Sequence, residues 1–75
     1  MPQISKETAN QIAVAHLKRQ KSTDKIDVAE VEAQGGGYIV RGTCPIDLQG
    51  HQWAEKFEVF VDPKGKIKAT NYALL

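Results

Sequence analysis

The sequence predicts an α+β domain in which one N-terminal helix packs on a four-stranded antiparallel meander sheet. Three observations lead to this fold class: an alanine-rich segment with helical spacing, later segments that alternate apolar and polar residues, and turn-forming residues between them. The clearest alternation runs from Trp53 to Val61. The turn Asp62-Pro63-Lys64-Gly65 follows, and Lys66-Ile67-Lys68-Ala69 restarts the pattern, so we expect a β-hairpin here.

The helix is predicted from about Lys6 to about Gln20. Ser5 is a good N-cap, because its hydroxyl can accept a hydrogen bond from a backbone amide that the first helical turn leaves unpaired. Helical spacing gathers one narrow, alanine-rich face. This face consists of Ala9, Ile12, Ala13, His16 and Leu17. Its small side chains allow the helix to lie close to a sheet.

Strands are expected at residues 26–34, 38–44, 52–62 and 66–74. In the first of them, Ile26 and Val28 are out of phase with Val31 and Ala33. Either a β-bulge near Ala29-Glu30 or a later start of the strand would reconcile the two sets. The glycines at 35–37 predict a turn into the second strand.

The longest connection is expected between Cys44 and His51. Pro45 interrupts the ladder of backbone hydrogen bonds, and Gly50 permits a turn. We therefore interpret residues 45–51 as a loop that is available for contacts.

Composition predicts a single small domain, residues 1–75, with a thin core. A net charge of +1 argues against a dedicated nucleic-acid or membrane-surface binder. Apolar runs are too short for a membrane-spanning helix. Cys44 is the one cysteine and no signal peptide is visible, so we expect a cytoplasmic location, or an extracytoplasmic one if a leader was removed.

Several segments together resemble the PepSY domain family. The matching pieces are Ala9 and Ala13 in the helix, Gly37-Tyr38-Ile39-Val40, and the run Phe57 to Ile67 with its Val-Asp-Pro-Lys-Gly-Lys-Ile ending. The resemblance extends over nearly the whole chain. It implies a non-catalytic module of the kind that inhibits or regulates a protease.

Catalysis and metal binding have little support in the sequence. The residues with the chemistry for a nucleophile–base set are Cys44, Asp47, His51 and His16. No supporting motif accompanies them, and the simpler interpretation is a half-buried Cys44 and an exposed His51. Two histidines and one cysteine, widely spread, also lack the spacing of metal ligands. We expect a protein that is not an enzyme and has no cofactor.

A local basic cluster lies at the end of the predicted helix. It consists of Lys18, Arg19, Lys21 and Lys25. One interpretation is an anion or nucleic-acid contact. The other is a solvated helix C-terminus, where positive side chains interact favourably with the helix dipole.

Phe60 is the main candidate for an interaction surface. If Phe57, Val59 and Val61 face the helix, Phe60 faces the other way. We expect Ile39, Tyr72 and Leu74 to share that side and to form an apolar interface there. Trp53 is interpreted as a packing residue at the end of the core, with a recognition anchor as the alternative.

Taken together, the sequence predicts a non-enzymatic binding or regulatory module. It would act through the open sheet face or the Pro45–His51 loop, on an unidentified protein partner or on a second copy of itself. The alternative is a small nucleic-acid-associated protein that uses the basic cluster.

Overall fold

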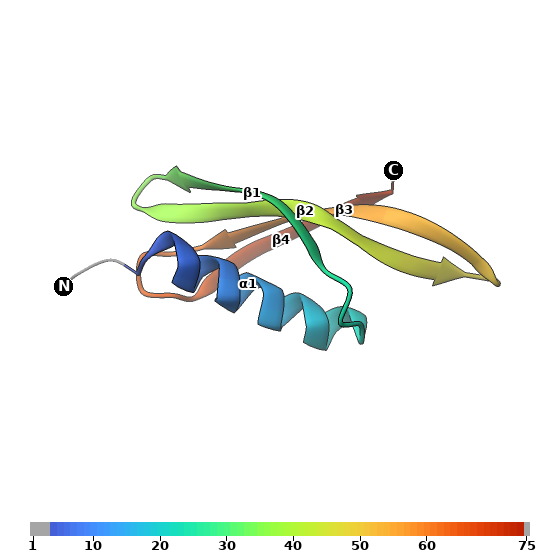
Figure 1. The fold of residues 1–75 in the computed structure, drawn as a ribbon. Coiled ribbons are helices and arrows are strands. Elements are labelled where there is room, and N and C mark those ends of the chain that lie inside the picture. The colour runs from blue at the N-terminus through green and yellow to red at the C-terminus, as the bar shows by residue number, and fades with distance from the viewer. Residues whose placement is uncertain (1–3, 75) are drawn as a thin grey trace.

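The computed structural model describes residues 4–74, except for the side chains of Asp47 and Leu48. In this range the chain forms a helix followed by four strands. The elements are α1 (Lys6–Lys21), β1 (Asp27–Gln34), β2 (Gly37–Leu48), β3 (His51–Val61) and β4 (Ile67–Leu74). All neighbouring strands are antiparallel in the order β1-β2-β3-β4, and α1 lies along one face of the sheet (Figure 1). The predicted α+β meander is confirmed.

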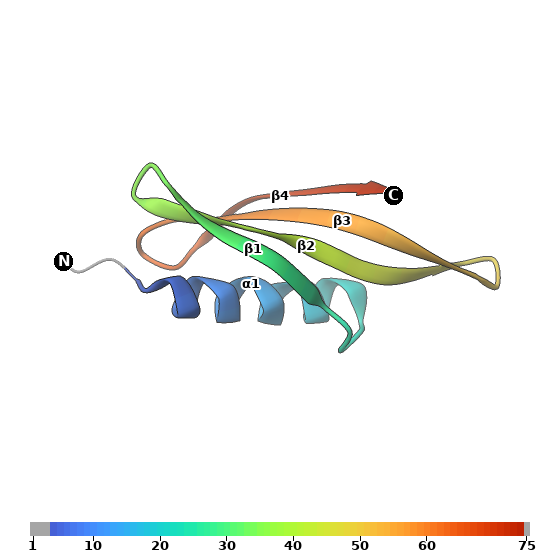
Figure 2. The same ribbon diagram turned by 45° about the horizontal axis from the view of Figure 1, so that its top comes forward.

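Helix α1 begins where the sequence predicts. The Ser5 side chain accepts a hydrogen bond of 3.1 Å from the backbone amide of Thr8. The helix ends at Lys21, and Ser22 caps it in a left-handed conformation. Ala9, Ala13 and Leu17 are fully buried on the face that packs against β1, β2 and β3 (Figure 2).

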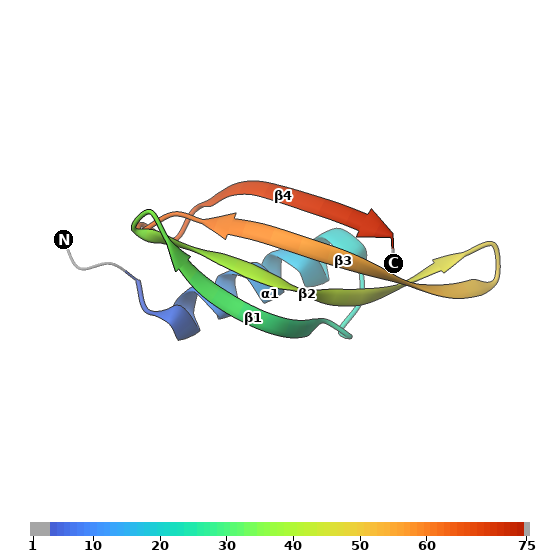
Figure 3. The same ribbon diagram turned by 90° about the horizontal axis from the view of Figure 1, so that it is seen from above.

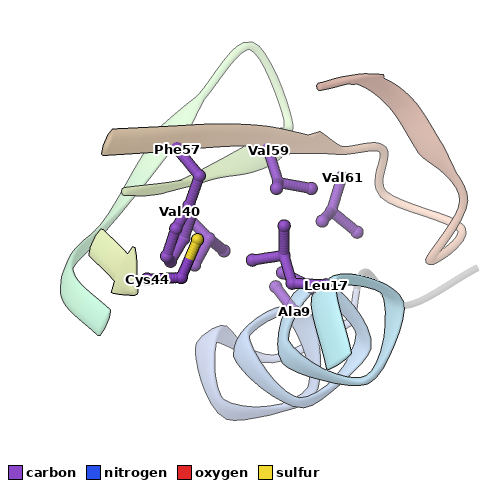
Figure 4. Packing of buried hydrophobic residues seen from close by; sticks show 8 residues of the cluster. Ala9, Leu17, Val40, Cys44, Phe57, Val59 and Val61 are labelled. Atoms are coloured by element: carbon purple, nitrogen blue, oxygen red, sulfur yellow. The ribbon is translucent and has the colours of Figure 1, made fainter. Parts of the chain in front are cut away.

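The core lies between α1 and the two central strands. Its sheet side consists of Val40, Cys44, Phe57, Val59 and Val61 (Figure 4). Phe57 lies directly across from Gly42 in the β2–β3 ladder. A Cβ at Gly42 would overlap the carbonyl oxygen of Asp27 and lie 2.7 Å from the Phe57 ring. Glycine is therefore required here by close packing.

Strand β1 contains the predicted bulge. Its register against β2 shifts between Val28 and Glu30, so Ala29 is the extra residue. The shift places Val28 and Val31 on the same side of the sheet, where both pack against the core. The alternative of a late strand start is not what the chain adopts, since β1 already begins at Asp27.

The prediction of a loop between Cys44 and His51 is wrong. Strand β2 continues through Pro45 to Leu48, and β3 begins at His51. Gln49 and Gly50 form a two-residue turn with φ of 52° and 83°, the backbone typical of a tight hairpin. The pairing of β1 with β2 extends only as far as Asp27 and Thr43. Pro45 therefore has no β1 neighbour, and its missing backbone N–H is tolerated there.

Residues 45–54 consequently form a two-stranded ribbon that projects beyond the rest of the sheet. The last residue of β4, Leu74, lies opposite Glu55, and the first residue of β1, Asp27, lies opposite Thr43. The ribbon extends past the end of α1 in every view, most clearly from above (Figures 1 and 3). It contributes to the elongated shape of 47 × 19 × 17 Å.

Candidate interaction surface

The face of the sheet that packs against α1 continues beyond the helix and exposes apolar side chains there. Ile46 opposes Trp53, and Glu55 opposes Leu74. Because strand residues alternate between faces, Trp53 and Leu74 lie on the same side as Phe57. Trp53 is 49% exposed, Leu74 60% and Tyr72 39%, whereas Ile46 is half-buried. We call Ile46, Trp53, Tyr72 and Leu74 the hairpin-end patch.

Along β3, an ion pair at Glu55 lies between Phe57 of the core and Trp53 of this patch. The Lys21 ammonium at the end of α1 contacts the Glu55 carboxylate and lies 3.9 Å from the centre of the Tyr72 ring. Burial alone would lower the pKa of Lys21, but the hydrogen bond and the charge of Glu55 outweigh burial and raise it. Burial also raises the pKa of Tyr72, against a smaller opposing effect of Lys21. The end of α1 is thereby held against β3 and β4.

A shallow hollow of about 530 Å³ adjoins the patch on its β1 side. Its wall includes Lys25, Ile26, Pro45 and Trp53, from the α1–β1 connection and the base of the ribbon. Its lining contains both apolar and charged side chains. Such a hollow beside an exposed indole could receive a side chain from another protein.

Tyr72 and Leu74 do not share the side of Phe60, and that prediction is wrong. Tyr72 opposes Phe57, which belongs to the core. The reason is a register shift between Phe60 and Val61: Val61 opposes Ile67, but Phe60 opposes Ala69. Lys68 is therefore the extra residue in β4, and it reverses the alternation for the rest of the strand.

The open face of the sheet is mainly charged. Arg41 Nε donates to Glu58 Oε2 at 2.7 Å, and Arg41 Nη1 donates to Glu30 Oε1 at 3.0 Å and Glu32 Oε2 at 2.9 Å. These hydrogen bonds raise the pKa of Arg41, and the hydrogen bond from Arg41 lowers the pKa of Glu58. Sequence reasoning missed this cluster, although one arginine among alternating glutamates on adjacent strands is a signal for it.

Phe60 and Ile39 oppose each other directly on this open face, as expected. Ile39 is only 3% exposed, and Phe60 is half-buried. The pair thus offers less apolar surface than the hairpin-end patch. A binding role for Phe60 and Ile39 stays a prediction.

Of the candidate catalytic residues, Cys44 and His51 do not come together. Cys44 is buried opposite Glu55, and burial with the Glu55 charge raises the pKa of its thiol, which disfavours the nucleophilic thiolate. His51 lies four residues before Glu55 in β3, about 13 Å away at the rise of a strand. His16 is on α1, and the side chain of Asp47 lies outside the described residues.

Two further absences apply to the described part of the chain alone. No three His, Cys, Asp or Glu side chains gather there in a way that could hold a metal ion. Within residues 4–74, no helix has the length and apolar character needed to cross a membrane.

The basic cluster is divided by the structure. Lys18, Arg19 and Lys25 are exposed, whereas Lys21 is engaged with Glu55 and Tyr72. A nucleic-acid site would also need aromatic side chains on which bases can stack, but Phe60 and Tyr72 lie on opposite faces of the sheet. They therefore do not form one stacking platform beside the cluster.

Comparisons with family models, with curated proteins and with solved structures found no match to this chain. The resemblance to PepSY domains accordingly stays a prediction.

Proposed function

We propose that this protein is a non-enzymatic binding or regulatory module that acts through protein–protein contacts at the hairpin-end patch. One observation supports this most directly. The exposed large hydrophobic side chains of the described residues, Trp53, Tyr72 and Leu74, all lie on the α1 face of the sheet, between the end of α1 and the base of the ribbon. Apolar side chains gathered in this way are typical of interaction sites, whereas scattered ones are ordinary surface.

Trp53 is the proposed anchor of the contact. Aromatic residues are enriched at the energetically important centres of interfaces, and tryptophan most strongly among them. Its neighbour across the ribbon, Ile46, is apolar, and the adjacent hollow carries Lys25 and Asp24 at the border. An apolar centre with a polar border is the usual composition of a protein interface.

The resemblance to PepSY domains supports a finer form of the proposal, in which the partner is a protease that the module inhibits or regulates. A cytoplasmic location also stays part of the proposal. It is supported by the single cysteine, which cannot form an internal disulfide.

The proposal is tested by affinity capture from native lysate with the immobilised protein and two variants. Trp53→Ser removes the anchor, and Gln52→Ser changes the neighbouring exposed residue, which faces the other side of the ribbon. We expect one partner to be retained by the unmodified chain and by Gln52→Ser, but not by Trp53→Ser.

The retained protein is then purified, and its affinity is measured by calorimetry at low and high salt. Loss of the Trp53 anchor should cost about 2 kcal/mol or more, roughly a thirtyfold weaker affinity, with little dependence on salt. Equal retention by the two variants, or no retained protein at all, would remove the support for this surface. Protease assays with the captured partner test the finer form.

The alternative function is a small nucleic-acid-associated protein that uses Lys18, Arg19 and Lys25. The exposure of these side chains at one end of α1 favours it, and the ion pair of Lys21 with Glu55 counts against it. An affinity for nucleic acid that falls steeply with added salt, and that Lys18→Gln weakens, would favour this alternative.

A further inference from the structure

The two edges of the sheet differ in how well they resist pairing with another strand. At one edge, β1 carries Asp27, Glu30 and Glu32 and is bulged at Ala29. At the other edge, β4 has no partner on its outer side in the described part of the chain. Beyond the bulge at Lys68, its last six residues, Ala69–Leu74, have a regular register and contain no charged residue and no proline. Charges and bulges protect an edge, whereas an uncharged, unbulged edge is a template for another strand.

We propose that two copies of this chain pair antiparallel through their β4 edges, which makes one continuous sheet. The two-fold axis would stand perpendicular to the sheet near Asn71 and Tyr72. With this symmetry, both α1 helices lie on the same side of the joined sheet. The inference rests on the proposed function, because it names a second copy of this chain as the partner of Tyr72 and Leu74, the two residues of the hairpin-end patch that belong to β4.

The side chains of β4 are complementary to a second copy of themselves. On the α1 side, the two Tyr72 side chains would lie beside each other at the axis, and Leu74 of each copy would lie beside Thr70 of the other, so exposed apolar groups become covered. The opposite side presents Ala69, Asn71 and Ala73, which are small and uncharged. The charge nearest the axis is that of Lys21, which lies over the Tyr72 ring and is paired with Glu55.

The distribution of charge selects the antiparallel arrangement. Lys66 and Lys68 are near the start of β4, and the rest of the strand is uncharged. Antiparallel pairing keeps the lysines of the two copies at opposite ends, whereas parallel pairing would place them side by side. Like charges at adjacent positions of paired strands are destabilising.

Head-to-tail pairing of β4 with the acidic β1 of another copy is the competing arrangement. It is disfavoured because β1 is bulged at Ala29 and because Arg41 already binds Glu30 and Glu32. Such pairing would also be open-ended and produce filaments instead of a closed dimer.

The expected dimer is reversible. A single strand pair with two apolar side chains from each copy belongs to the small end of stable interfaces, below about 1,200 Å² in total. We therefore expect dissociation in roughly the micromolar range. Trp53 lies beyond the end of β4, so it stays exposed in the dimer and can still bind a different protein.

Sedimentation equilibrium over a wide concentration range tests the inference with the unmodified chain, Asn71→Lys and Gln34→Lys. Asn71 opposes Glu58, so a lysine there is compatible with the folded monomer, but it places two like charges beside the proposed axis. Gln34→Lys adds the same charge at the β1 edge and is the matched control. We expect Asn71→Lys to weaken the dimer by roughly tenfold or more and the control to change it little.

A charge swap distinguishes β4–β4 pairing from every other contact. Mixing Asn71→Lys with Asn71→Asp should restore a dimer that neither variant forms well alone, and circular dichroism confirms that each is folded. An unmodified chain that stays monomeric at all concentrations would overturn the inference. So would a dimer that Asn71→Lys leaves unchanged, or growth beyond a dimer. None of these outcomes bears on the proposed function, which is measured by Trp53-dependent capture of a different protein.

Discussion

The two halves of the β2–β3 hairpin share one continuous ladder but have different surroundings. The inner half, from Tyr38 to Cys44 and from Glu55 to Val61, has β1 and β4 beside it and α1 above it. The outer half, residues 45–54, has neither. Phe57 is 2% exposed in the inner half, whereas Trp53, on the same face of the same strand, is 49% exposed.

The difference shows that pairing two strands does not bury their side chains. Both aromatic residues have a cross-strand partner, Gly42 for Phe57 and Ile46 for Trp53. Only the helix, with Ala9, Ala13 and Leu17, closes the inner half. Apolar residues of the inner half therefore stabilise the fold, and those of the outer half remain available for contacts.

Truncating the two aromatic residues should give the largest difference in the free energy of unfolding between the inner and outer halves. Phe57→Ala is expected to cost about 3–5 kcal/mol, because it removes a buried ring and leaves a cavity above Gly42. Trp53→Ala should cost less than about 1 kcal/mol, since half of its surface already contacts water. Urea denaturation measures both values, and similar costs would contradict the comparison.

Adding a methyl group should give the next largest difference. Gly42→Ala is expected to cost about 1–3 kcal/mol or more, because the new Cβ meets the backbone of Asp27 and the Phe57 ring. Ala54→Val adds bulk to the outer half at an exposed position and should change the free energy of unfolding by less than about 0.5 kcal/mol. A well-tolerated Gly42→Ala would mean that β1 and β2 can separate at low cost.

Parts of this division could be predicted from the sequence and parts could not. The Ser5 cap follows from the residue type at the start of the helix. The helix face of Ala9 and Ala13 and the bulge at Ala29 follow from the spacing of apolar residues within a single helix or strand. The continuation of β2 through Pro45 depends on where β1 stops. No local pattern contains that information.

The same limit explains the errors at the candidate site. The side on which Tyr72 lies depends on a register shift at Lys68. Counting alternate residues along the sequence assumes that no such shift occurs. The Arg41 cluster depends on the alignment of three strands at once. The interpretation of Trp53 as a packing residue missed its 49% exposure. That exposure follows from the length of the ribbon, which the loop interpretation did not foresee.

Alkaline pH should weaken the junction between the halves. Folding raises the pKa of Lys21 above its ordinary value of 10.5, so the stability this group contributes is present below that pH. It is lost as pH rises through the folded-state pKa, and the raised pKa values of Tyr72 and Cys44 act in the same direction. Stability measured by urea denaturation should therefore fall progressively above about pH 9.

Lys21→Met is the variant that isolates this contribution. It should cost about 1 kcal/mol at neutral pH through loss of the ion pair and of the contact with the Tyr72 ring. Its stability should then fall less steeply with pH than that of the unmodified chain. Parallel curves for the two proteins would assign the alkaline loss to other groups.

The smallest effect on global stability is expected at the end of the ribbon. Gly50 has φ of +83°, so alanine there would be strained by about 1 kcal/mol. The outer half has no helix packed on it, so it can open without unfolding the core, and the strain should appear as local opening. Amide hydrogen exchange in Gly50→Ala should accelerate for residues 45–54 but not for the inner half, with the free energy of unfolding changed by less than about 0.5 kcal/mol. If the inner half also exchanged faster, the two halves would be one cooperative unit. The exposed surface around Trp53 would then be coupled to the core.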